Sequence, residues 1–196
     1  MGGRINLNER IVIYMPGKRD YDETDRILEA LGIPSPSRMM NYITDSWRRE
    51  HESKPINLNT TISAGLNKYP IHWINGVAKA LGISTKERKK EKIEKIVSKL
   101  TTQSDEVIGK LTPESREALK MVIKAGGWLR YNQLSKKFGG EEDDSYFWES
   151  EPHASTIGIL RLHALLFVGK AGISGRMYKV AVVPKDIREQ LEGMLK

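Results

Sequence analysis

The chain has 196 residues, of which 39% are hydrophobic and 29% are charged, and its formal charge at pH 7 is +7. These proportions are typical of a folded globular protein and too apolar for a disordered chain. The absence of cysteine excludes disulfides, thiolate zinc sites and cysteine nucleophiles. No apolar run approaches the roughly 20 residues of a membrane span, and residues 1–6 lack the apolar core of a secretory signal. We therefore expect a cytoplasmic protein with no membrane partner.

The positive charge is concentrated in one quarter of the chain. Residues 51–100 carry ten basic and four acidic side chains, whereas residues 1–50 carry eight of each. Clustered Lys and Arg displace counterions from phosphates and supply most of the non-specific affinity for nucleic acid. The excess predicts a phosphate-binding surface, with a solvated helix face as the alternative.

Two short motifs recur at nearly the same offset. The sequence INLN at residues 5–8 returns at 56–59, and ALGI at 30–33 returns at 80–83. A repeat of this kind indicates two related units. We expect a first unit at 1–54, a second at 55–103 and a third, different domain at 104–196.

The first unit has the pattern strand, helix, helix. Residues 10–15 alternate like a strand, Gly32 is placed to end a helix, and Ser37 is placed to cap the next one. This order resembles the ribbon-helix-helix repressors, in which two chains pair their strands and insert them into the DNA major groove. The resemblance implies that the strand pairs with another strand, either from a second chain in a homodimer or from the second unit of the same chain. It also implies base contacts from Arg10 and Tyr14, and a phosphate held near Ser35 and Ser37. A generic strand–helix–helix piece is the alternative.

The second unit carries the basic helix. Its first helix has apolar residues between Ile71 and Leu81 and ends at Gly82, and a second helix is expected over 86–100. The sequence LGIST at 81–85, followed by KKEKI at 89–93, resembles the SAP module, which binds DNA. The resemblance implies DNA contacts from Lys86, Arg88, Lys89 and Lys90. Interleaved glutamates at 87, 91 and 94 could instead pair with these lysines.

The third domain shows an alternation of helices and strands, so the fold class as a whole is mainly α with small β elements (α+β). Thr112 and Pro113 start a helix to about 124, residues 125–127 break it, and a strand at 128–130 precedes a helix at 131–138. A third helix is expected at 155–166, followed by strands at 167–170 and 177–183 and a closing helix at 185–196.

This order resembles the winged-helix domains of transcription regulators and helicase-associated proteins. In DNA-binding members the third helix enters the major groove and the wing touches phosphate. The resemblance implies contacts from the following residues: Ser155, Thr156 and Arg161 on the helix, and Lys170, Arg176 and Lys179 on the wing.

An acidic loop at 141–151 argues against this transfer, because carboxylates beside the third helix would repel phosphate. A structural or protein-docking role of the winged helix is therefore favoured over base reading. Tyr146, Phe147 and Trp148 in the same loop are either buried or an exposed partner anchor, and burial is the commoner fate. The run at 141–144 is expected to be a solvated loop rather than a metal site.

The chain shows no motif of an enzyme. Its four histidines lack the spacing of metal ligands on one helix face, and nucleotide-binding and serine-hydrolase motifs are missing. We expect no catalytic residue, metal or cofactor. The function expected is a nucleoid-associated, multi-module regulator of transcription that binds double-stranded DNA without catalysis. The alternatives are a protein-docking adaptor in a replication, repair or transcription assembly, with the partner at the winged helix, and an RNA-binding module.

Overall fold

The computed structural model describes residues 26–28, 30–33, 36–142 and 144–195, which belong to two compact units, 1–45 and 46–196. The strand expected at 10–15 lies outside the described residues. Residues 26–28 and 30 are helical, and Gly32 has a φ of 70°, the left-handed conformation expected of the residue that ends a helix. Helix α2 (Pro36–Ser53) follows.

The part of the second unit that comes first in the chain is helical. It contains α3 (Ile62–Asn67), α4 (Ile71–Ala80), α5 (Lys89–Thr102) and α6 (Ser104–Gly109). The helix expected from residue 86 begins only at Lys89, because Arg88 takes the N-cap position and its backbone N–H donates to Glu91 Oε2 at 3.4 Å. Residues 86–88 therefore precede the helix.

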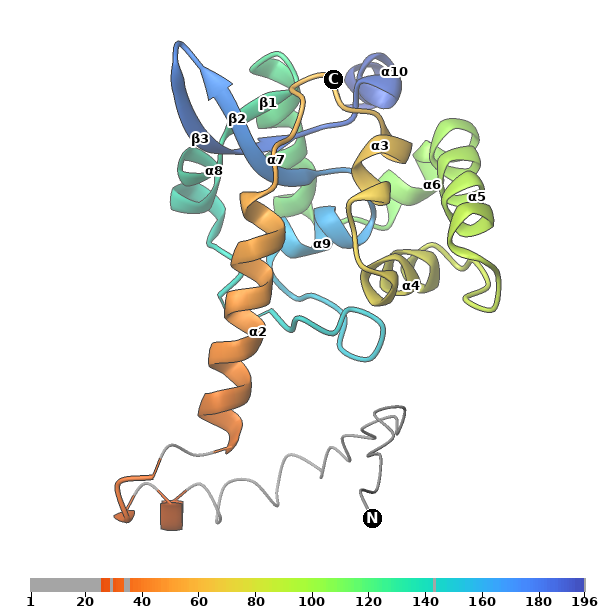
Figure 1. Ribbon diagram of the computed structural model, residues 1–196. Coiled ribbons are helices and arrows are strands. Elements are labelled where there is room, and N and C mark those ends of the chain that lie inside the picture. Colours follow the sequence, from red (N-terminus) through yellow and green to blue (C-terminus); the bar gives the residue numbers. More distant parts are fainter. Residues whose placement is uncertain (1–25, 29, 34–35, 143, 196) are drawn as a thin grey trace, which may run out of the picture. The chain divides into compact units, whose positions relative to one another are not determined.

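The later part of the second unit combines helices with a small sheet (Figure 1). Its elements are α7 (Pro113–Lys124), β1 (Trp128–Arg130), α8 (Tyr131–Phe138), α9 (Thr156–Leu162), β2 (Phe167–Ile173), β3 (Arg176–Val182), a 3-10 turn (Lys185–Ile187) and α10 (Arg188–Met194). The sheet is antiparallel with the order β1-β3-β2, and Val182 lies opposite both Trp128 and Phe167. The expected α+β class is confirmed.

Local signals explain where these elements begin and end. Thr112 Oγ1 accepts a hydrogen bond from the Ser115 N–H at 3.1 Å, so α7 starts where the Thr-Pro pair predicted. Helix α9 ends at Leu162, four residues before the expected end at 166. The reason is a turn in which Ala164 adopts a φ of 54° and redirects the chain into β2.

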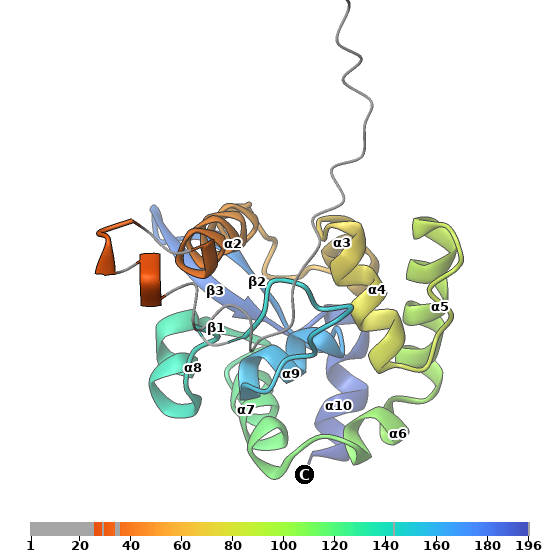
Figure 2. The same ribbon diagram turned by 90° about the horizontal axis from the view of Figure 1, so that it is seen from below.

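A hydrophobic core runs through the second unit from Ile56 to Leu191. Helix α9 lies in the middle of it and packs against α4, α7 and α8, as Figure 2 shows. The core therefore joins the segments 55–103 and 104–196, which the sequence divides into separate domains. Among the described residues, no helix is both long enough and apolar enough to cross a lipid bilayer.

Candidate functional site: a lysine surface over a buried arginine

Helix α9, the helix expected to enter the DNA groove, is enclosed by the protein. The structure describes all seven of its residues, and each is buried or half-buried. Ser155 is its N-cap, and the Ser155 hydroxyl accepts from the Gly158 N–H at 2.9 Å while donating to the Asp144 carboxylate. The expectation that Arg161 reads bases is therefore corrected, because its side chain is buried. Ser155 and Thr156 are half-buried, and their expected base contacts stay a prediction.

Arg161 is an internal cation. Its side chain is 1% exposed, and Nη1 lies 2.6 Å from Glu52 Oε1 and 2.8 Å from Glu141 Oε2. The guanidinium carbon also lies 5.3 Å and 5.2 Å from the ring centroids of Trp73 and Trp148, which stack on each other at 4.3 Å. Burial alone would lower the pKa of Arg161, but the nearby carboxylates raise the pKa well above its usual value. The residue stays charged and holds three segments of the chain together.

The acidic loop is not solvated as expected. Glu141 is 3% exposed and Asp144 is 7% exposed. Asp144 Oδ1 accepts from the backbone N–H groups of Ala154 and Ser155 at 3.0 and 3.1 Å, which ties the loop to the start of α9. The expected burial of the loop aromatics is confirmed for Tyr146 and Trp148, and Phe147 is half-buried.

Glu141, Asp144 and His153 bring their ligand atoms within 4.8 Å of one another, which raises the question of a metal ion. Each carboxylate already accepts a hydrogen bond from another side chain: Glu141 accepts from Arg161, and Asp144 accepts from Ser155. His153 Nδ1 lies 3.1 Å from Asp144 Oδ2. Burial would raise the pKa of Asp144, but hydrogen bonds from His153 and Ser155 outweigh it and lower that pKa. The cluster fits a structural network better than a cation site, because a cation there would be repelled by Arg161.

The basic residues expected around the start of α5 divide into two kinds. Lys86, Arg88 and Lys90 are exposed, and Lys90 Nζ lies 4.0 Å from Glu94 Oε1. Lys89 is half-buried and donates to the backbone carbonyls of Asn67 at 3.1 Å and Tyr69 at 2.9 Å. Lys89 therefore closes the end of α3 as well as adding charge to the surface.

Four lysines from separate segments meet beside α3, and we call them the lysine surface: Lys54, Lys68, Lys89 and Lys170. The backbone of Lys170 on β2 exchanges hydrogen bonds with Lys54 O at 3.0 Å and the Ile56 N–H at 2.8 Å. Lys68 Nζ donates to Pro55 O, in the same short segment. Burial lowers the pKa of Lys89, and the charge of Lys54 lowers it further, so these two ammonium groups are near enough to repel each other. The fold thus brings lysines that are up to 116 residues apart in the sequence onto neighbouring segments.

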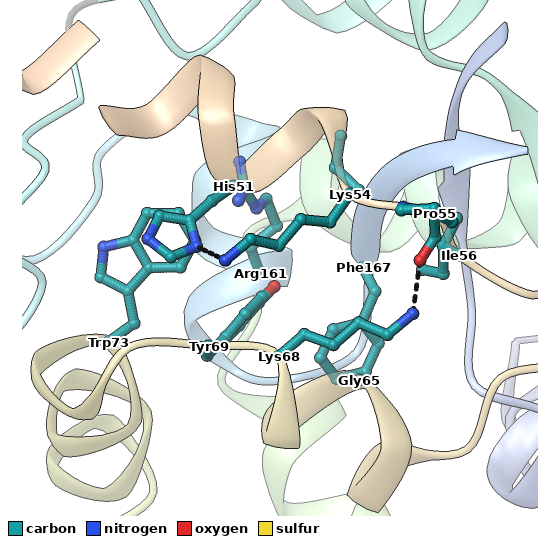
Figure 3. A pocket seen from close by; sticks show the side chains of 11 residues that line it. His51, Lys54, Pro55, Ile56, Gly65, Lys68, Tyr69, Trp73, Arg161 and Phe167 are labelled. Carbon is teal, nitrogen blue, oxygen red and sulfur yellow. Dashed lines mark hydrogen bonds between the residues drawn. The ribbon is translucent and has the colours of Figure 1, made fainter. Parts of the chain in front are cut away.

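A small pocket lies beside two of these lysines, Lys54 and Lys68 (Figure 3). Its lining includes His51, Lys54, Lys68, Tyr69, Arg161 and Phe167. Lys54 Nζ lies 3.0 Å from His51 Nδ1. Burial, and then the charge of Lys54, lower the pKa of His51, so the imidazole is neutral at pH 7 and accepts from the lysine. Burial raises the pKa of Tyr69 to about 12, so the phenol keeps its proton.

Sequence reasoning missed Lys54, Lys68 and Tyr69 as site residues. The only signal for the two lysines was the positive charge of residues 51–100, which does not say where each lysine lies. Tyr69 gave no signal, because its position under the lysines depends on how the chain packs after α3. These residues, rather than the third helix, form the candidate site.

The remaining expected site residues are placed as follows. Arg10, Tyr14 and Ser35 lie outside the described residues, and Ser37 lies in the first turn of α2 with its side chain also outside them. Arg176 is exposed at the tip of the β2–β3 hairpin. Lys179 is half-buried, with Nζ 2.6 Å from Glu52 Oε2 and 3.7 Å from the centroid of the Tyr131 ring, so its charge is already paired within the protein and its expected contact with phosphate stays a prediction.

Comparison of the chain with models of known protein families, with curated proteins and with solved structures finds no match.

Proposed function

We propose that this protein binds double-stranded DNA without catalysis, through phosphate contacts made by the lysine surface. The observation that carries the proposal is the meeting of Lys54, Lys68, Lys89 and Lys170 beside α3. The acidic side chain of the same segment, Glu52, is buried and paired with Arg161 and Lys179. Its charge is compensated inside the protein, so the lysines act on solvent with little opposition from it.

We also propose a role in DNA binding for the β2–β3 hairpin, as the wing of a winged helix. Three helices, a short strand between the first two and a final hairpin are the order of that fold, and α7 to β3 follow it. In this arrangement the hairpin is the wing, and it contributes Lys170 and Arg176, which are both exposed. We propose that the wing and the start of α5 contact the duplex, while α9 serves only the core. Such contacts position the protein on DNA without reading its sequence.

Three expectations from the sequence stay predictions. They are the resemblance to ribbon-helix-helix repressors, the resemblance to the SAP module and a role in transcription regulation. For the expected homodimer, one observation is favourable: Met39, Tyr42 and Ile43 of α2 are 55%, 71% and 36% exposed, which is a large apolar area to leave in water.

The first test is the salt dependence of duplex binding, measured by fluorescence anisotropy on a labelled random duplex. Four phosphate contacts predict that log affinity falls with log salt with a slope of about −3 to −4. The variant Lys68→Glu/Lys170→Glu should bind weakly at every salt concentration, and its slope should be smaller by about 2. The matched control, Lys124→Glu/Lys136→Glu, makes the same charge change at exposed positions of α7 and α8.

Three results would contradict the proposal. They are a slope near zero, equal losses in the two double variants, and tighter binding to duplex RNA than to duplex DNA. The first would favour the protein-docking adaptor, and the third would favour the RNA-binding module.

A further inference from the structure

The pocket under the lysine surface contains two polar atoms that lack partners. Tyr69 is 6% exposed and Arg161 is 1% exposed. Neither Tyr69 Oη nor Arg161 Nε makes a hydrogen bond of good geometry among the described residues. The two side chains lie near each other, since the Arg161 guanidinium opposes the rise in the pKa of Tyr69 by its charge and by side-chain hydrogen bonding. Buried polar groups in folded proteins are nearly always paired, so two unpaired donors that line one pocket indicate an acceptor that comes from outside the chain.

A third donor faces the same space. Figure 3 shows the side chain of Lys54 extending toward His51, and Lys54 lines the pocket together with Tyr69. Of the other titratable groups in the lining, Lys68 adds positive charge and His51 is neutral at pH 7. The carboxylates behind the pocket, Glu52 and Glu141, are engaged on the opposite nitrogen of the guanidinium, Arg161 Nη1. The open side of the pocket is therefore rich in donors and positive in charge.

The size of the pocket limits what can enter. Its interior is about 20 Å³, which is room for about one water-sized group and not for a base, a sugar or a whole phosphate. An acceptor atom can enter only if the rest of its group remains at the mouth, near the ammonium groups of Lys54 and Lys68. A tetrahedral phosphate meets this requirement, because it can present one oxygen inward and keep its other oxygens outside.

We infer that this pocket binds one oxygen of a phosphate group, which accepts hydrogen bonds from Tyr69 Oη, Arg161 Nε and Lys54 Nζ. The inference rests on the proposed function, because it takes the phosphate to belong to the nucleic-acid backbone. It deepens that function by giving the lysine surface a fixed contact point. Charge-assisted hydrogen bonds to a preformed pocket hold a phosphate in one position, whereas exposed lysines attract phosphates without fixing any.

The test uses the variant Tyr69→Phe, which removes one hydroxyl and leaves the ring contacts of Tyr69 with Trp73 and Trp148 in place. Since the hydroxyl makes no hydrogen bond of good geometry within the described chain, its loss should change the melting temperature in chloride by little. Inorganic phosphate at constant ionic strength should raise the melting temperature of the native protein. We expect the apparent phosphate affinity to be about tenfold weaker in Tyr69→Phe.

A second pair of variants shows whether a weaker response to phosphate comes from the pocket itself or from a general loss of structure. Lys54→Met should also weaken the response to phosphate, whereas Lys136→Met, at an exposed position on α8, should leave it unchanged. Equal responses in the native protein and in Tyr69→Phe would overturn the inference, and so would the absence of any response in the native protein, since the pocket would then hold only water.

The duplex assay separates the two sources of phosphate. If Tyr69→Phe weakens both phosphate and duplex binding, the pocket takes a backbone phosphate, as inferred. If the native protein binds DNA with a steep salt dependence but Tyr69→Phe binds equally well, the pocket inference fails and the proposed function stands. If phosphate binds but DNA does not, the proposed function fails. The phosphate that the pocket takes would then not belong to the nucleic-acid backbone.

Discussion

Arg161 is a buried cation whose two carboxylate partners come from other segments of the chain. It lies on α9, the third helix of the winged-helix pattern. Its partner Glu52 lies 109 positions earlier in the chain, and its partner Glu141 lies in a loop that looks solvated. Charge and helix position can be read from the sequence, but such a pairing cannot, because it depends on how distant segments pack.

The stability of the protein should depend on pH through the Asp144 carboxylate. The carboxyl of Asp144 has a lowered pKa in the fold against an ordinary value of 3.8. A lowered pKa in the folded state means that the carboxylate stabilises the protein above the ordinary value, and that this contribution is lost as the pH falls from about 5 to about 2. Asp144→Asn should therefore be less stable at pH 7 by about 2 kcal/mol and should lose less stability on acidification.

The measurement is urea denaturation at several pH values. Glu142→Gln is the matched control, because it removes an exposed carboxylate from the same loop and should leave the dependence on pH close to that of the native protein. Parallel pH profiles for the native protein and Asp144→Asn would show that the hydrogen bonds to this carboxylate contribute nothing to stability.

At the scale of elements, signals within a few residues are enough to predict most boundaries. The Thr112 cap with Pro113 predicts the start of α7, and α8 occupies the whole range expected for it, 131–138. The errors occur at two helix ends. Helix α5 starts late because residues 85–87 bend and Arg88 takes the N-cap position, and α9 stops early at the positive φ of Ala164. Local propensity favours helix in both places, but these bend and cap conformations override it.

The acidic loop and α9 approach each other at a glycine, which gives a prediction for these elements. A Cβ on Gly158 would collide with the Asp144 carboxylate and the His153 ring, both buried. We expect Gly158→Ala to destabilise the protein by about 1–3 kcal/mol, because neither neighbour can move into solvent without losing its hydrogen bonds. Gly109→Ala, at the end of α6 with open space around it, should be neutral or slightly stabilising.

Thermal or urea denaturation compares the two glycine variants directly. If Gly158→Ala were as stable as Gly109→Ala, the loop would not be held tightly on α9. The tight packing of the acidic loop, and with it the reason for excluding α9 from the DNA groove, would then be wrong.

At the scale of the whole molecule, the core decides how the second unit unfolds. Leu100 on α5 and Leu119 on α7 are fully buried in the same core, although the sequence divides their segments into separate domains. We expect one cooperative transition for residues 46–196. Leu100→Ala and Leu119→Ala should each lower the free energy of unfolding by about 2–5 kcal/mol and shift the midpoint of that same transition downward. Tryptophan fluorescence is a suitable probe, since all four tryptophans lie in this unit.

Two separate transitions, each shifted by only one of the leucine variants, would favour the division into a helical unit and a third domain. The repeat of INLN and ALGI would then mark a true structural boundary. The sequence-based prediction of fold class needs only the local patterns of helix and strand, whereas the number of independently folding parts depends on which faces pack together, and the local patterns do not specify those faces.

The contact between Lys170 and the segment 54–56 has a consequence for self-association. Strand β2 is at the edge of the sheet, where unpaired backbone groups can recruit a strand from another molecule. Both backbone groups of Lys170 are bonded to Lys54 and Ile56 instead. A stretch of the chain's own backbone thus caps this edge halfway along the hairpin, and the protein gains protection from edge-to-edge aggregation at the place where it presents its positive charge.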